Sequence, residues 1–187
     1  MNGNLNRRRF LQAAAGAAGV AAAQGKTRSV AIVVDPADAV ASSEAARWAA
    51  EELARALTER GLSARIYSGA AQAPAADLRI MAAGMASPGA AAALKAAGAR
   101  AEAVPEALAL CQGKEGVWAC GHDARGLTYA LLELADRARN SPDPVAALAV
   151  PKPVTERPAN TIRGITRLFT SEVEDKPWYN DREMWPA

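Results

Sequence analysis

Residues 116–135 read Gly-Val-Trp-Ala-Cys-Gly-His-Asp-Ala-Arg-Gly-Leu-Thr-Tyr-Ala-Leu-Leu-Glu-Leu-Ala and give the clearest pattern of secondary structure in the chain. Its first residues are a short apolar run that ends in Gly121, which is typical of a buried strand. Asp123 can cap a helix, and apolar residues recur after it at intervals of three and four. The recurring residues are Leu127, Ala130, Leu131, Leu134 and Ala138. The stretch therefore predicts a strand followed directly by an amphipathic helix.

The same order of elements occurs near the start of the chain. The apolar run at 29–34 stops at Asp35-Pro36 and predicts a buried strand. Ser42-Ser43-Glu44 then opens a helix that Gly61 closes, and a strand follows at 63–67. One face of this helix is expected to carry its core residues, which are Ala45, Ala49, Trp48, Leu53 and Leu57.

Further elements are expected between these two units and after them. The predicted elements are a strand at 78–83, a helix at 88–97 that Gly98 closes, and a hairpin of 107–111 with 116–120 around 112–115. A breaker cluster follows at 140–144, and the proline-containing stretch 150–158 is interpreted as a surface linker. Strands that alternate with helices, together with one hairpin, predict an α/β (α+β) fold with a mixed β-sheet and helices packed on it.

The first 23 residues are interpreted as an export signal. Arg7 and Arg8 form a twin-arginine pair, Phe10 and Leu11 follow, and the Ala- and Gly-rich run after them is too short to span a bilayer stably. Small side chains at Ala21–Ala23 predict cleavage after Ala23. The segment resembles twin-arginine export signals, which implies the twin-arginine export machinery as a partner and a periplasmic or secreted location. The alternative is an N-terminal helix that is buried or anchors the chain in a membrane; the weakly apolar run disfavours a stable anchor.

Charge argues against a nucleic-acid partner. The chain has 22 Lys and Arg and 20 Asp and Glu, but three of the arginines and none of the acidic residues lie in residues 1–23. The remaining 164 residues therefore carry 19 basic and 20 acidic side chains. No basic stripe is left to bind a phosphate backbone.

Cys111 and Cys120 are the only cysteines, and each lies in an apolar strand-like segment. An exported protein meets an oxidising compartment, so a disulfide is one interpretation. A tight hairpin would place the two sulfurs at different levels, however, which favours the other interpretation, two buried free thiols. No metal-ligand spacing is present, and no cofactor is expected.

Residues for catalysis are scarce. His122 is the only histidine, and its position between Gly121 and Asp123 favours a role in the turn over catalysis. No zinc-protease, P-loop or serine-nucleophile motif occurs. The carboxylate pairs Glu51/Glu52 and Glu133/Asp136 lie beside arginines, as solvated surface charges do.

The C-terminal segment combines carboxylates with aromatic residues. Trp178, Tyr179 and Trp185 lie close in sequence to Glu172, Glu174 and Asp175. Aromatic faces beside carboxylates suit sugar rings. The same aromatics also suit an interface with another domain, and this second interpretation is favoured.

The strand 117–121 and the motif Arg125-Gly126-x-x-Tyr129-Ala130 resemble the small α/β domain that precedes the catalytic barrel in exported glycoside hydrolases of the β-N-acetylhexosaminidase and α-glucuronidase kind. The resemblance covers about residues 28–170. It implies that the segment 161–169, with Arg163-Gly164, is the first strand of a (β/α) barrel, truncated in this chain. It also implies that Arg163 contacts a sugar. Thr166, Arg167 and Leu168 stand where the hexosaminidase pattern has an aspartate, which leaves specificity for N-acetylhexosamine unsupported.

These observations predict three segments: a signal peptide at 1–23, a small α/β domain at 24–155, and a linker with the start of an incomplete catalytic-type domain at 156–187. The leading functional hypothesis is a non-catalytic N-terminal domain of an exported glycoside-hydrolase-like protein, with the acid–base carboxylates beyond Ala187. Its expected partners are a carbohydrate ligand and the missing C-terminal domain. Two alternatives stay open: a periplasmic module that binds glycan or cell-wall fragments, and a structural or interaction protein without a ligand.

Overall fold

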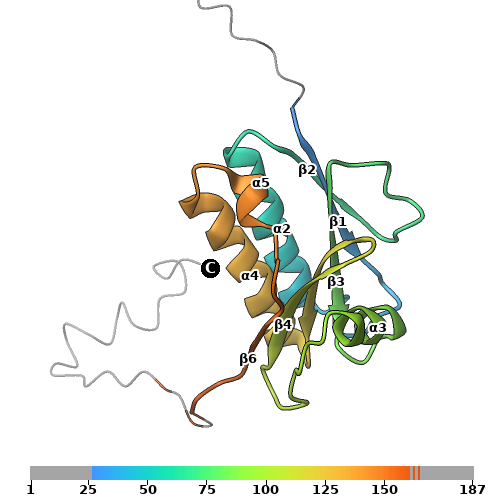
Figure 1. Ribbon diagram of the computed structural model, residues 1–187, viewed down its shortest axis with the longest axis vertical. Helices are drawn as coiled ribbons and strands as arrows, with labels where there is room; N and C mark the ends of the chain where they lie inside the picture. Colours follow the sequence, from blue (N-terminus) through green and yellow to red (C-terminus); the bar gives the residue numbers. More distant parts are fainter. Residues whose placement is uncertain (1–26, 161, 163, 165–187) are drawn as a thin grey trace, which may run out of the picture. The chain divides into compact units, whose positions relative to one another are not determined.

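The computed structural model describes residues 27–160, 162 and 164, and its core is a single six-stranded sheet (Figure 1). The strand order is β2-β1-β3-β5-β4-β6. Four neighbouring strands are parallel: β1 (Ser29–Val34), β2 (Ser63–Tyr67), β3 (Leu78–Gly84) and β5 (Gly116–Gly121). Two strands run antiparallel to their neighbours: β4 (Leu108–Gly113), which pairs with β5, and β6 (Val154–Glu156), which pairs with β4. The predicted mixed sheet is therefore confirmed.

Helices cover both faces of this sheet. α2 (Glu44–Glu59) and α4 (Ala124–Asn140) pack side by side on one face, and the short α5 (Pro144–Ala147) contacts α4 (Figure 1). α3 (Pro88–Ala96) packs on the opposite face against β4 and β5. The α/β class expected from alternating strands and helices is thus the class observed.

The two faces of each central strand contribute to two separate cores. In β1, Val30, Ile32 and Val34 belong to the core beneath α2 and α4, whereas Ala31 and Val33 belong to the core beneath α3. The alternation follows from the two-residue period of a strand, and burial on both faces explains why the run is apolar throughout. Each fully buried Leu or Ile stabilises the fold by about 1.5–3 kcal/mol relative to exposure.

The first helix confirms its predicted ends but not its predicted core face. Ser43 accepts a hydrogen bond from the Ala46 amide at 3.3 Å, and Gly61 after the last turn has a φ of 78°, which glycine adopts without strain. Trp48, expected in the core, is 48% exposed, and Ala45 is also exposed. The reason is geometric: a helix turns about 100° per residue, so Trp48 lies about 140° around the helix from Leu53, which is at the centre of the buried stripe. That stripe consists of Ala46, Ala49, Ala50, Leu53, Ala56 and Leu57.

The strand-to-helix turn at 121–126 is built as expected. One carboxylate oxygen of Asp123 accepts from the Gly126 amide at 2.9 Å, which caps α4. The other oxygen accepts from the Glu106 amide at 2.9 Å. Glu106 has a φ of 64°, in the left-handed region that non-glycine residues enter at a cost. Asp123 therefore fixes the start of α4 and the loop that leads into β4 together.

Two segments in the later part of the domain contain elements that were not predicted. The breaker cluster at 140–144 ends α4 at Asn140, as predicted, but it also leads into a helical turn, because the Asp143 side chain accepts hydrogen bonds from the amides of Val145 and Ala146 and starts α5. The stretch 150–158, interpreted as a linker, contains the edge strand β6. Pairing with β4 gives backbone N–H and C=O groups of β6 hydrogen-bond partners, with Val154 opposite Leu110 and Glu156 opposite Leu108.

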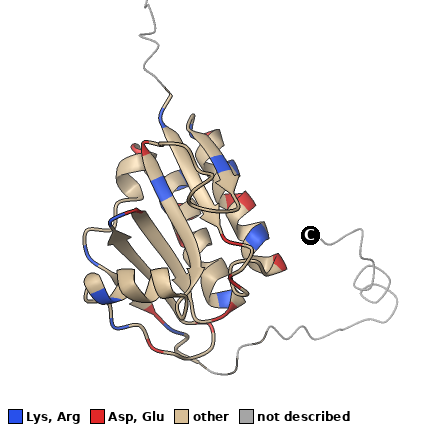
Figure 2. Cartoon of the chain, turned by 90° about the vertical axis from the view of Figure 1, so that its right-hand side faces the viewer, with Lys and Arg blue, Asp and Glu red and all other residues tan. Residues whose placement is uncertain are grey.

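The chain divides into two compact units, with the boundary between Arg157 and Pro158. In the first unit, basic and acidic residues are interspersed in the view of Figure 2. No helix among the described residues is long and apolar enough to cross a membrane. The predicted signal segment 1–23 and the predicted barrel strand 161–169 lie outside the described residues, apart from positions 162 and 164.

Candidate functional site

The carboxyl ends of the four parallel strands meet at one edge of the sheet, and the connections diverge there. The chain leaves β1 toward α2 on one face and leaves β3 toward α3 on the other, although β1 and β3 are neighbours. Such a switch point opens a crevice at the strand ends, where ligands of open α/β sheets usually bind. Two hollows occupy this edge.

The larger hollow lies between α2 and the ends of β1 and β2, and we call it the α2-side hollow. Its volume is about 370 Å³, within the range of small-molecule sites. Three segments build it: the end of β1 with the turn after it, the first two turns of α2, and the end of β2. Its lining residues are Val34, Pro36, Ser42, Arg47, Glu51, Ile66, Tyr67 and Ser68.

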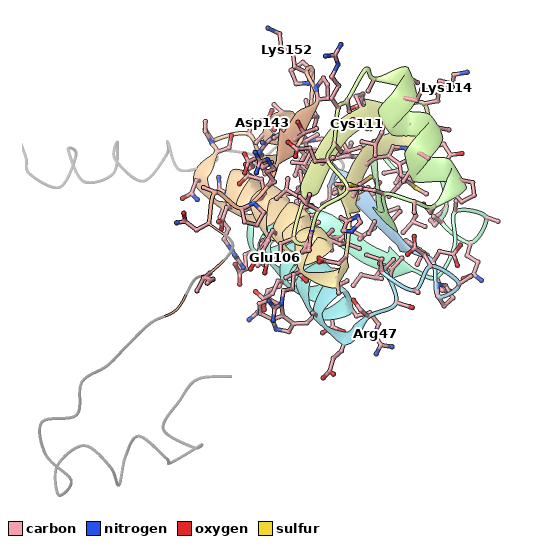
Figure 3. The ribbon with its side chains drawn as sticks, turned by 90° about the horizontal axis from the view of Figure 1, so that it is seen from below. Arg47, Glu106, Cys111, Lys114, Asp143 and Lys152 are labelled. Carbon is pink, nitrogen blue, oxygen red and sulfur yellow. The ribbon has the colours of Figure 1, made fainter. Side chains whose placement is uncertain are left out.

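Most polar side chains at this hollow make no hydrogen bond or ion pair within the described residues. Arg47 and Glu51 lie one helical turn apart on α2, and Figure 3 shows Arg47 extending from the ribbon into solvent. Within the described residues, neither has a hydrogen-bond or ion-pair partner, and the same is true of the Ser42 hydroxyl. Ser68 differs, because its hydroxyl donates to Gln72 Oε1 at 2.7 Å.

The smaller hollow, on the α3 side of the same edge, has a volume of about 170 Å³. It contains two carboxylates, but Asp38 is fully engaged: one oxygen accepts from the amides of Val40 and Ala41 and the other accepts from Gly84. Asp35 accepts from the Ala37 amide at 2.8 Å. Both therefore shape the turn after β1.

The Trp118 indole forms one wall of the smaller hollow and explains its size. A methyl group on Gly89 would come within 2.7 Å of the ring, and one on Gly113 within 2.6 Å. Only glycine leaves room for the indole at these two positions. The ring fills space that would otherwise enlarge the hollow.

His122 lies in the turn between β5 and α4, as predicted. Its amide donates to the Ala107 carbonyl at 2.9 Å, and its side chain is exposed. It lines neither hollow. The geometry gives it a backbone role in joining the start of α4 to β4.

Of the two predicted carboxylate pairs on the helices, Glu52, Glu133 and Asp136 contact arginines, whereas Glu51 has no described partner. Glu133 accepts from Arg137 at 2.8 Å near the surface. Glu52 is not a solvated surface charge: its side chain is only 14% exposed and contacts Arg55 and, at 3.3 Å, Arg139 of α4. It joins the two helices because α2 and α4 pack together, which one helix pattern alone does not reveal. No cluster of three metal-ligating side chains occurs within the described residues.

Cys111 and Cys120 are both buried and both free. In the antiparallel register Cys111 lies opposite Trp118, and Cys120 lies opposite Ala109, so the thiols are diagonal neighbours. Burial raises the pKa of the Cys111 thiol. Burial first, then the neighbouring Cys111 and Asp38, raise the pKa of Cys120 far above its ordinary value of 9.0. Neither thiol is suited to act as a nucleophile.

The residues expected to contact sugar or to direct export cannot be placed. Arg163 lies outside the described residues, as do Arg7, Arg8, Phe10, Leu11 and the cleavage position Ala23. The aromatic and acidic cluster at 172–185 also lies outside them. These assignments stay predictions.

Sequence reasoning missed the α2-side hollow. Its signal in the sequence is the position of polar residues directly after two parallel strands: Asp35-Pro36 follows β1, and Ser68-Gly69 follows β2. Carboxyl ends of adjacent parallel strands share one edge, where binding residues of α/β sheets gather. The missing information was that β1 and β2 are neighbours.

Comparison with known proteins gives distant similarity only. No protein-family model matches the chain, and no curated protein matches it. One similar solved structure is a GH138 enzyme targeting pectin rhamnogalacturonan II, with 19% identity, a TM-score of 0.43, and coverage of 70% of this chain and 12% of that chain. Another is a family GH115 4-O-methyl-α-glucuronidase with specificity for decorated arabinogalactans, with 20% identity, a TM-score of 0.42, and coverage of 59% of this chain and 13% of that chain. The chain thus spans a small fraction of either enzyme.

Proposed function

We propose that residues 24–155 form a non-catalytic domain of an exported glycoside-hydrolase-like protein that acts in carbohydrate metabolism. The motif at 125–130 supports the resemblance to the small domain that precedes a catalytic barrel. The observation that carries the non-catalytic role is that neither hollow of the described part of the chain holds two uncommitted carboxylates.

Glycoside hydrolysis ordinarily requires two carboxyl groups that face one cleft, one as acid and one as base or nucleophile. Asp38 and Asp123 bind backbone amides through both oxygens, and Glu52 and Glu133 pair with arginines. The α2-side hollow has a single carboxylate, Glu51. Within the described part of the chain, therefore, neither hollow offers two uncommitted carboxylates.

The proposed role is to support an adjoining catalytic domain. The first unit has cores on both faces of its sheet, and its edge strand β6 ends at Glu156, one residue before the unit boundary. Because β6 is hydrogen-bonded to β4, the chain that continues after Glu156 starts from a fixed position on the sheet. In this proposal Arg163, a few residues further on, contacts a sugar, and the exported location depends on the signal at 1–23.

Turnover assays test the non-catalytic role. The full chain, purified after export, is incubated with aryl glycosides of N-acetylglucosamine and glucuronic acid, and the released phenol is followed. We expect no hydrolysis above a heat-denatured control. Hydrolysis that is lost in Glu51→Gln or Asp35→Asn would contradict the proposal, because it would place an acid–base group in this domain.

Export is tested separately by cell fractionation. Replacement of Arg7 and Arg8 by lysine keeps the charge but removes the twin-arginine pair. We expect the unaltered chain in the periplasmic or secreted fraction, shortened by cleavage after Ala23, and the double variant inside the cell at full length. Equal export of both would contradict the twin-arginine route.

A further inference from the structure

We propose that the α2-side hollow binds a monosaccharide-sized ligand that carries an anionic group, either the carboxylate of a uronic acid or the phosphate of a sugar phosphate. This inference does not rest on the proposed non-catalytic role, because every residue that lines the hollow lies between positions 34 and 68.

The first argument is the charge at the rim. Of the arginines within the described residues, eight contact a carboxylate or a carbonyl oxygen, and only Arg47, Arg65 and Arg100 have no such partner. Arg47 alone among these three lines a hollow. A free guanidinium presents several N–H donors in one plane, a geometry that matches the two oxygens of a carboxylate or phosphate.

The second argument is the carboxylate beside this arginine. Glu51 lies one turn further along α2 and lines the same hollow without a described partner. An ionised carboxylate only accepts hydrogen bonds, and it repels a second anion placed against it. A bare inorganic anion is therefore disfavoured. A ligand with an anionic group at one end and hydroxyl donors at the other satisfies both side chains.

The third argument is the remaining lining. Val34, Pro36 and Ile66 supply apolar contacts. Tyr67 also borders the hollow, but its side chain packs against the core beneath α3, on the other face of the sheet. Ile66 is 40% exposed, which is high for a large apolar side chain of this domain. A sugar ring presents C–H groups to such surfaces and hydroxyls to polar groups around them. A volume of about 370 Å³ suits one ring and not a chain of several.

Amide chemical shifts test the site directly. The full chain labelled with ¹⁵N is titrated with glucuronate, glucose 6-phosphate, glucose and inorganic phosphate. We expect saturable shifts confined to the amides of residues 34–51 and 66–68 with glucuronate, glucose 6-phosphate or both. Glucose and inorganic phosphate should bind at least about tenfold more weakly, because glucose lacks the anionic group and inorganic phosphate lacks the sugar ring with its hydroxyl groups.

Variants identify the groups responsible. Arg47→Gln should weaken binding of the anionic sugar about tenfold or more, the usual effect of losing a charge-assisted hydrogen bond. Glu51→Gln should reduce the preference for glucuronate or glucose 6-phosphate over inorganic phosphate. Arg65→Gln is the matched control: it removes the same charge from an exposed arginine of β2 outside the hollow, and it should leave affinity unchanged.

The titrations distinguish the two ligand classes from each other and from the results that overturn the proposal. Tighter binding of glucuronate identifies a uronic acid, and tighter binding of glucose 6-phosphate identifies a sugar phosphate. The proposal is overturned by an absence of saturable shifts with either ligand, by equal binding of glucose or inorganic phosphate, or by equal affinity of Arg47→Gln and the unaltered chain. None of these results bears on turnover, so the proposed non-catalytic role stands or fails on its own assay.

Discussion

The Asp38 carboxylate accepts a hydrogen bond of 2.8 Å from the Gly84 amide, which joins the turn after β1 to the end of β3. Its other oxygen accepts from Val40 and Ala41. One side chain thus satisfies three backbone donors at the switch point between the two hollows. The position of the α2-side hollow relative to the sheet depends on this turn.

We expect Asp38→Ala to lower the free energy of unfolding by about 2 kcal/mol, because it leaves partly buried amides without an acceptor. Urea denaturation followed by circular dichroism measures this. Asp35→Ala is the control: Asp35 accepts from the Ala37 amide in an exposed turn, and its loss should cost less than about 1 kcal/mol. Equal losses in the two variants would show that the Asp38 contacts contribute little.

Gly126, in the first turn of α4, lies directly against the backbone of Ala107. A Cβ atom at position 126 would overlap the Ala107 carbonyl. Glycine to alanine inside a helix ordinarily stabilises by up to about 1 kcal/mol. Here we expect the opposite sign: Gly126→Ala should destabilise the domain by about 2–3 kcal/mol, since rigid backbone must move.

The control for this prediction is Gly69→Ala, because a Cβ at Gly69 has no heavy atom within 4 Å. Its melting temperature should change little. If Gly126→Ala melts at or above the temperature of the unaltered chain, the close packing of α4 on the loop before β4 is not a constraint on stability.

Much of the fold could be predicted because its signals are local. Caps such as Ser43 and Asp123 and apolar runs such as 29–34 lie within a few residues of the elements they define. β6 was missed because it is three residues long and lies among prolines, so its only strong reason to be a strand is pairing with β4. The exposure of Trp48 follows from its angular position on α2, away from the buried stripe, and the apolar character of the side chain does not reveal this position.

The candidate site was less predictable than the fold. The α2-side hollow combines residues from β1, α2 and β2, and only the topology brings them together. Arg47 and Glu51 resemble many surface residues of helices in sequence alone. What distinguishes them is the lack of a described partner beside a hollow, which requires coordinates.

The buried cysteines should be unreactive in the folded protein. Burial holds the thiol pKa of both Cys111 and Cys120 above the ordinary value, so the thiolate that reacts is scarce at neutral pH. We expect a disulfide-exchange reagent at pH 8 to label neither residue in buffer and both in concentrated urea. A Ser63→Cys variant, exposed on β2, should label at once and serves as the positive control. Rapid native labelling of Cys111 or Cys120 would contradict the packing of β4 on β5.

Asp143 should make stability depend on pH in the acidic range. The Ala146 amide first, and then Arg28 at 2.9 Å, hold the pKa of this carboxyl below its ordinary value of 3.8. A group whose pKa is lower in the folded state contributes stability that is present above the unfolded pKa, and this contribution is lost as pH falls through the folded pKa.

Asp143→Asn should therefore be less stable than the unaltered chain at pH 7, and the difference should shrink as pH falls below 3.8. Urea denaturation at a series of pH values measures this difference. Asp136→Asn, at the exposed end of a 3.9 Å ion pair with Arg139, is the control for loss of a surface carboxylate and should change the free energy of unfolding little at pH 7. A difference for Asp143→Asn that stays constant down to the lowest pH would mean that proton binding at this carboxyl is not linked to folding.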